Sequence, residues 1–183
     1  MNTLFLVTAL LFNFTPQDGS LIFIEIGNHI VQNVTNSTVS HVAIIFKEND
    51  EFVVYEAEPP EVRKVTLTEY YKEIEKLNKK KRKLHRQRRI WIANPDTPLT
   101  DEQKTTALKY LKSQLGKKYS VGSYISSQQQ DDSIHCCELV GETLKSIGIN
   151  YTEQSWTDSP FDVWVKTKPF YSKRERITYP NSK

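Results

Sequence analysis

The stretch HVAIIFKENDEFVVYEA, residues 41–57, decides the fold. It holds two apolar runs rich in β-branched and aromatic residues, His41–Phe46 and Phe52–Ala57, joined by the short polar segment Lys47–Glu51. Such runs favour β-strands, and a connection this short joins antiparallel neighbours. The stretch therefore predicts a β-hairpin.

Further strands are predicted on both sides of this hairpin. The residues after it, Pro59 and Pro60, end its second strand because proline cannot donate a ladder hydrogen bond. The polar segment 27–40, rich in Asn and Thr, is predicted to be a loop. The remaining strands are expected at Ser20–Ile26, Val62–Val65 and Ile90–Ala93.

Helices are predicted mainly in the second half of the chain. Thr66 is a suitable N-cap for the first helix, and the pattern Thr100-x-x-Gln103 is a capping box for the second. A third helix follows the polar loop Ser126–Ser133 and ends at a glycine. The expected helices are 69–77, 100–115 and 134–147. Strands followed by helices predict an α+β domain in which helices pack on a mostly antiparallel sheet.

The composition is that of a soluble globular protein. The chain has 183 residues, of which 38% are hydrophobic and 26% charged, and this length suits one domain. A formal net charge of +3 is small for this size, so charge alone requires neither a nucleic acid nor a membrane as partner.

Two segments differ in composition from the rest of the chain. The apolar run Leu4–Phe12 has the length of a signal-peptide core, although no basic residue precedes it and no small-x-small cleavage site follows. Residues 1–16 are thus interpreted as a signal peptide or an N-terminal extension, and residues 17–183 as the folded domain with a basic insert at residues 79–89. With a signal peptide the protein is exported to the periplasm or cell surface; otherwise it is cytoplasmic.

The second segment is the basic insert Lys79–Arg89, KKKRKLHRQRR. Its charge suits an anionic polymer or a membrane surface, and the alternative is a solvated loop. No nucleic-acid recognition motif accompanies it, so we expect no specific nucleic-acid partner.

The two cysteines of the chain, Cys136 and Cys137, are adjacent. A bridge between neighbours would strain normal disulfide geometry, so a structural staple is not expected. A zinc site would have to recruit scattered histidines at no recognisable spacing, and we expect no metal and no other cofactor. Thiol chemistry or simple burial remain as explanations.

A cysteine at a helix start gains thiolate character from the helix dipole, which makes this pair a candidate nucleophile. Among the histidines, His41 is the best base because it opens a strand after a loop, and Glu56 on the paired strand suits it as a partner. His135 is discounted, since neighbours on a helix point to different faces. The alternative is two buried cysteines and a structural histidine.

Five segments, taken in chain order, resemble the permuted branch of the NlpC/P60 superfamily, the YaeF/YiiX-type proteins. Asp18–Phe23 (DGSLIF) resembles the family's Gly-Asp-Leu-Ile-Phe strand, and Ser40–Ile44 (SHVAI) its Ser-His-Val-Gly-Ile strand. Val54–Ala57 (VYEA) resembles its apolar-Glu-Ala strand, and Leu115–Tyr119 (LGKKY) its Gly-x-x-Tyr-Asp turn. His135–Val140 (HCCELV) resembles its Tyr-Cys-Ser-Glu-Leu-Val helix start. The resemblance spans about residues 17–165. It departs from the family at Ala43, Ser120 and His135.

The resemblance implies a circularly permuted papain-like fold and assigns the roles within it. Cys136 matches the family's nucleophile and His41 its base, with Glu56 as the third member of a triad. Cys137 replaces the family's serine, and both it and Tyr119 are expected at the oxyanion site or pocket.

The implied activity is a cysteine hydrolase that cleaves an amide, in a cell-wall peptide or a related compound, through an acyl-enzyme. Two alternatives stay open. One is a lipid-directed acyl hydrolase or acyltransferase with the same triad, and the other is a binding module without turnover. The expected partner is a peptide or a lipid-like amide or ester substrate.

Overall fold

The computed structural model describes residues 14–26, 32, 35–80 and 87–177. Within them, eight strands form one sheet in the order β7-β6-β4-β3-β2-β1-β5-β8, antiparallel except for the short β6–β7 pair. The strands are β1 Ser20–Glu25, β2 Val39–Glu48, β3 Glu51–Glu58, β4 Glu61–Thr66, β5 Arg89–Ala93, β6 Lys118–Tyr119, β7 Ser133–Ile134 and β8 Arg174–Ile177.

The predicted hairpin is the β2–β3 pair at the centre of this sheet. Both strands are longer than predicted, because the polar residues Lys47, Glu48 and Glu51 continue the ladder. The turn shrinks to Asn49 and Asp50, whose φ angles of 48° and 63° suit the tight turns that follow the twist of a hairpin.

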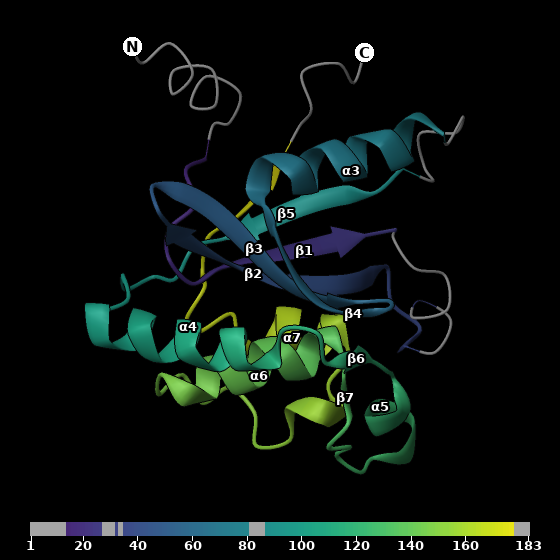
Figure 1. Cartoon of the computed structure of the whole chain (residues 1–183). Helices are drawn as coiled ribbons and strands as arrows, with labels where there is room; N and C mark the ends of the chain where they lie inside the picture. The colour runs from purple at the N-terminus through teal and green to yellow at the C-terminus, as the bar shows by residue number, and fades with distance from the viewer. Residues whose placement is uncertain (1–13, 27–31, 33–34, 81–86, 178–183) are drawn as a thin grey trace, which may run out of the picture.

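Helices cover both faces of the sheet, as Figure 1 shows: α3 (Leu67–Lys79) lies on one face, and α4 (Asp101–Gln114), α6 (Cys136–Ser146) and α7 (Pro160–Lys166) lie on the other. Alternate residues of β1 pack into the cores on the two faces of the sheet. Leu21 and Phe23 belong to the core beneath α4, α6 and α7, while Ile22 and Ile24 pack toward α3. A sheet buried on both faces explains why its central strands are continuous apolar runs.

The capping residues act as predicted. The Thr66 hydroxyl accepts a hydrogen bond from the Glu69 amide, and the Thr100 hydroxyl accepts one from the Gln103 amide, each completing a capping box. The first helix nevertheless begins two residues before Glu69 and continues to Lys79. Among the helices of the described residues, none is long and apolar enough to cross a membrane.

The third predicted helix starts later than expected. Ile134 belongs to β7, where it pairs with Tyr119 of β6, and α6 begins at Cys136. His135 is the N-cap residue, in extended conformation. The short elements β6, α5 (Gly122–Ser126), η2 (Ser155–Thr157), α7 and β8 were not predicted, since runs of two to seven residues carry little periodicity.

Most of the proposed signal peptide or extension lies outside the described residues, as do His29, His85 and the middle of the basic insert. The two ends of the basic insert belong to regular elements: Lys79 ends α3 and Arg89 begins β5.

The core beneath α4 is expected to carry much of the stability. Leu111 of α4 is completely buried, so Leu111→Ala should lower the free energy of unfolding by about 2–5 kcal/mol through lost burial and a residual cavity. Urea denaturation measures this. The control is Ile125→Ala in α5, whose side chain is 67% exposed and which should change stability by less than about 0.5 kcal/mol. Equal effects of the two variants would contradict this assignment of the core.

Candidate active site

The site is built outward from the Glu56 carboxylate, which is completely buried on β3. Its Oε2 lies 2.7 Å from His41 Nε2, and its Oε1 accepts a hydrogen bond of 2.9 Å from Arg63 Nε. The antiparallel β3–β4 register sets Glu56 directly opposite Arg63. Each carboxylate oxygen therefore has a partner that carries, or can carry, a positive charge.

This pairing keeps Glu56 ionised. Burial by itself would raise the pKa of a carboxylate, but the hydrogen bond from His41 and the charges of His41 and Arg63 lower the pKa of Glu56 overall. Arg63 is held in turn by Glu73 of α3, with Nη2 and Oε2 2.8 Å apart. The arginine thus links the buried carboxylate to the helix that covers this face.

His41 lies on β2 next to an irregularity in the sheet. The β1–β2 register passes from Ile24–His41 to Glu25–Val39, which leaves Ser40 as an extra residue. Such a bulge bends a strand and re-aims the neighbouring side chains. Burial would lower the pKa of His41, but hydrogen bonding to Cys136 and Glu56 raises it well above its usual value. With Nε2 engaged by Glu56, the other ring nitrogen is left for Cys136.

Cys136 is the first residue of α6. No side chain caps this helix, and its first backbone hydrogen bond runs from the Leu139 amide to the His135 carbonyl. The amides of Cys136, Cys137 and Glu138 consequently have no intrahelical acceptor. Hydrogen bonding from Cys137 is the largest influence that lowers the pKa of Cys136 well below that of a free thiol. Interactions with His135 and His41 add to it against the opposing effect of burial.

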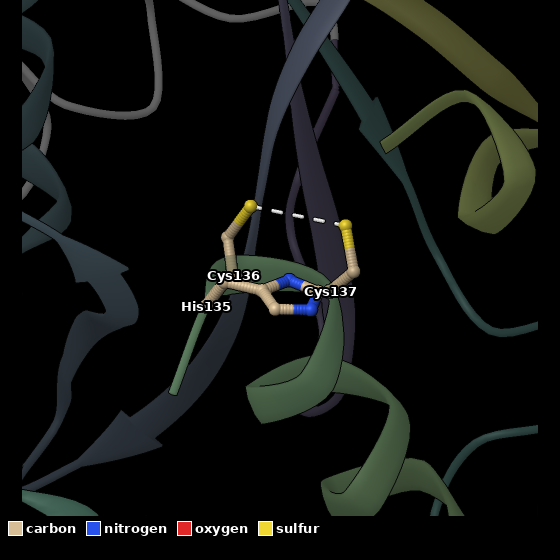
Figure 2. Close-up of side chains that lie close together, drawn as sticks. All are labelled: His135, Cys136 and Cys137. Atoms are coloured by element: carbon tan, nitrogen blue, oxygen red, sulfur yellow. Dashed lines mark hydrogen bonds between the residues drawn. The ribbon is translucent and has the colours of Figure 1, made fainter. Parts of the chain in front are cut away.

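Cys137 has the opposite character. Its side chain is completely buried, and its Sγ lies 3.8 Å from that of Cys136 (Figure 2). Burial and the neighbouring thiol raise its pKa well above the usual value, which favours the Cys137 S–H as the donor in this pair. The two adjacent thiols therefore differ, and Cys136 is the one with thiolate character.

His135 corrects the sequence interpretation. It was discounted as a helical neighbour of Cys136, but it precedes the helix in extended conformation, so helical geometry does not govern its direction. Its Nε2 lies 2.9 Å from the Trp156 carbonyl oxygen, and its interaction with Cys136 raises its pKa despite burial. Figure 2 shows its ring close to both thiols.

Tyr119 of β6 lines the same crevice as His41 and Ser40, where α3 contributes Tyr70 and Ile74. Burial and the nearby thiols raise its pKa, so its hydroxyl stays protonated. Glu138, also buried, accepts a hydrogen bond from Gln129 through Oε1.

The ligating atoms of His135, Cys136 and Cys137 all lie within 4.8 Å of one another. We expected a zinc site to require histidines scattered along the sequence, but these three residues are consecutive. One imidazole nitrogen and two sulfurs are a donor set typical of zinc and softer metals.

Helices on a mostly antiparallel sheet, with a cysteine at a helix start near a strand histidine, are the arrangement expected of a papain-like hydrolase. Residues 15–161 match the family model described as permuted papain-like amidase enzyme, YaeF/YiiX, C92 family. The chain belongs to this family, which confirms the predicted permuted papain-like fold and the assignment as a hydrolase of amide bonds.

Among the solved structures that share the fold is the crystal structure of metalloprotein yiiX from Escherichia coli O157:H7. It is 23% identical, with a TM-score of 0.58, and the match covers 92% of each chain. No curated protein sequence matches the chain.

The structure thus brings together Cys136, His41 and Glu56, with Cys137 and Tyr119 beside them. Sequence reasoning missed Arg63 and His135. For Arg63 a signal existed, because Glu56 and Arg63 are equally distant from the Pro59-Pro60 turn and so face each other in an antiparallel pair. His135 carried no such signal, because its direction depends on where α6 begins.

Glu56→Gln should show how the contribution of the Glu56 carboxylate to the free energy of unfolding depends on pH. A carboxyl group with a lowered folded-state pKa stabilises the fold above its usual pKa of 4.5, and this stabilisation is lost as the pH falls through the folded-state value. At neutral pH the variant should be less stable by about 3–5 kcal/mol, because one partner of a buried ion pair is gone. Urea unfolding at a series of pH values measures the gap, which should shrink in acid.

The matched control is Glu75→Gln on α3, whose exposed pairing with Lys79 should be worth less than about 1 kcal/mol at any pH. A stability gap for Glu56→Gln that stays constant far into acid would contradict the ionised state of Glu56.

Proposed function

We propose that this protein hydrolyses an amide bond with Cys136 as nucleophile, His41 as general base and acid, and Glu56 as the group that orients His41. The observation that carries the proposal is the continuous chain of contacts from Arg63 through Glu56 and His41 to Cys136. It joins a thiol of lowered pKa to an imidazole whose remaining nitrogen is fixed by a buried carboxylate.

In the first half-reaction the Cys136 thiolate attacks the substrate carbonyl carbon and forms a C–S bond. The amide C–N bond then breaks, and the imidazolium of His41 gives its proton to the leaving amine. The negative oxygen of the intermediate is stabilised by the free amides at the start of α6, with the Cys137 amide as the main donor. Tyr119, protonated and in the same crevice, lines the pocket.

In the second half-reaction His41 removes a proton from water, the hydroxide attacks the thioester carbonyl, and the Cys136 thiolate leaves. An acceptor amine or alcohol in place of water would make the same enzyme an acyltransferase. Glu56 keeps one tautomer of His41 throughout and stabilises its charged form.

The substrate we propose is a peptide amide of the cell-wall type or a related amide. A lipid-like amide or ester is the second candidate. The observation in its favour is the crevice at His41, whose lining includes the apolar residues Ile24 and Ile74 and the cationic Arg88. An apolar chain would contact the isoleucines, and an anionic head would pair with Arg88, although Glu58 also lines the crevice and opposes a negative charge.

Arg88 and Arg89 are also the described end of the basic insert Lys79–Arg89. We propose that this insert holds an anionic polymer or membrane surface close to the crevice. An exported location, in the periplasm or at the cell surface, would bring the enzyme to either kind of substrate.

Thiol labelling tests the nucleophile. Iodoacetamide should label chelator-treated native protein at Cys136 well below pH 8.5, where an ordinary thiol is mostly protonated. Labelling should vanish in Cys136→Ala, persist in Cys137→Ala with its profile moved to higher pH, and weaken in His41→Ala. Peptide mass spectrometry identifies the labelled residue. Slow labelling of both thiols near the pKa of a free thiol, regardless of His41, would leave a binding module as the better description.

Trapping of the acyl-enzyme tests the substrate. Intact-mass measurement after rapid acid quench should show an adduct on Cys136 with cell-wall-type peptide amides and none in Cys136→Ala. An adduct that forms only from lipid amides or esters would replace the peptide substrate with the lipid candidate. Arg88→Gln is the variant that separates the two, since it should raise KM for substrates with an anionic head and leave neutral peptides unchanged.

A further inference from the structure

We propose that Cys136, Cys137 and His135 bind a zinc ion, or another borderline-soft divalent metal, and that the bound ion holds the hydrolase in an inactive state. The inhibitory part rests on the proposed function of Cys136. The binding part rests on the donor atoms alone.

The spacing of the two sulfurs suits one shared ion. With Zn–S bonds of about 2.3 Å and tetrahedral angles, two thiolates on one zinc lie about 3.8 Å apart. Cys136 Sγ and Cys137 Sγ are 3.8 Å apart, and the His135 ligating nitrogen lies within 4.8 Å of both. Three ligands are therefore nearly in place without movement of the backbone.

His135 has the outer partner that a metal-bound histidine normally has. Such a ligand usually donates its second N–H to a carboxylate or a backbone carbonyl, which fixes the tautomer and orients the ring. His135 Nε2 meets the Trp156 carbonyl oxygen at 2.9 Å, which leaves the other ring nitrogen for the ion. The set is therefore one imidazole nitrogen and two thiolates, and the fourth position of a tetrahedral zinc ion is left for water.

Charge and access also agree with an ion at this position. Two thiolates would neutralise a divalent cation, which satisfies the requirement that buried charge be paired. The three consecutive ligands are buried, but the His41 side chain is 13% exposed and lines the crevice, which provides an entry path. An ion bound here takes the electron pair of the Cys136 sulfur, so that sulfur cannot attack a carbonyl.

Cobalt binding tests the site directly, with no substrate. The full chain, stripped with chelator, is titrated with Co²⁺ and followed by thiolate-to-cobalt charge-transfer absorption and by the visible bands of tetrahedral cobalt. One equivalent should saturate the spectrum, and Zn²⁺ should abolish it. Cys137→Ala should weaken binding by at least about 10-fold, since loss of even an outer-shell partner has an effect of this size.

The matched control is Glu138→Gln, a change in a buried carboxylate next to the cluster that should leave the cobalt spectrum unchanged. Where Cys137→Ala fails to fold by circular dichroism, His135→Gln takes its place with the same expected loss. Absence of charge-transfer absorption, or equal affinity in the wild type and the ligand variant, overturns the site.

Protection from alkylation tests the inactive state. Zn²⁺ should slow iodoacetamide labelling of Cys136 by at least about 10-fold, and Cys137→Ala should need at least about 10-fold more Zn²⁺ for the same protection. Labelling of Cys136 that is fast with and without Zn²⁺ overturns the metal inference and leaves the nucleophile intact. Cobalt binding to a protein whose metal-free Cys136 is unreactive overturns the proposed function and leaves the metal site standing.

Discussion

The structure depends on one constraint, a completely buried carboxylate that must stay ionised. An isolated charge in such a place would be neutralised or expelled, because its loss of hydration has to be offset by partners. Glu56 meets this requirement with His41 on one oxygen and Arg63 on the other. The three residues come from three neighbouring strands, so the register of these strands sets the geometry of the site. A slip of one residue in β3 or β4 would break the charge pairing and invert both faces together.

The helices on both faces of the sheet position the residues around Glu56. The α3 layer holds Arg63 through Glu73, while α6 brings Cys136 from the layer on the opposite face. Between the layers the β-bulge at Ser40 changes the course of β2 immediately before His41. At Gly141 a Cβ atom would lie 2.3 Å from Ser155 Cβ, so the glycine allows α6 to pack closely against η2. The start of the helix determines the direction of both the thiol and the free amides beside it.

Two adjacent thiols in one site acquire different properties for a physical reason. Cys136 interacts with two imidazoles, whereas Cys137 is enclosed and is left to donate its proton to its neighbour. The arrangement favours a single nucleophile. The donor atoms that create this difference are also those that a zinc ion prefers, which is why reactivity and susceptibility to metals are expected at the same position.

The sequence by itself determined the hairpin, the capped helices, the α+β class and the identity of the candidate residues Cys136, His41 and Glu56. These follow from local patterns: β-branched runs, capping boxes and family motifs that survive in order along the chain. The tertiary structure alone decided that α6 begins at Cys136 rather than at Ile134, that His135 lies beside the thiols, and that the pKa of Cys136 is lowered while that of Cys137 is raised. Such properties depend on burial and on contacts between residues far apart in sequence, such as Trp156 with His135. Local sequence periodicity therefore cannot predict them.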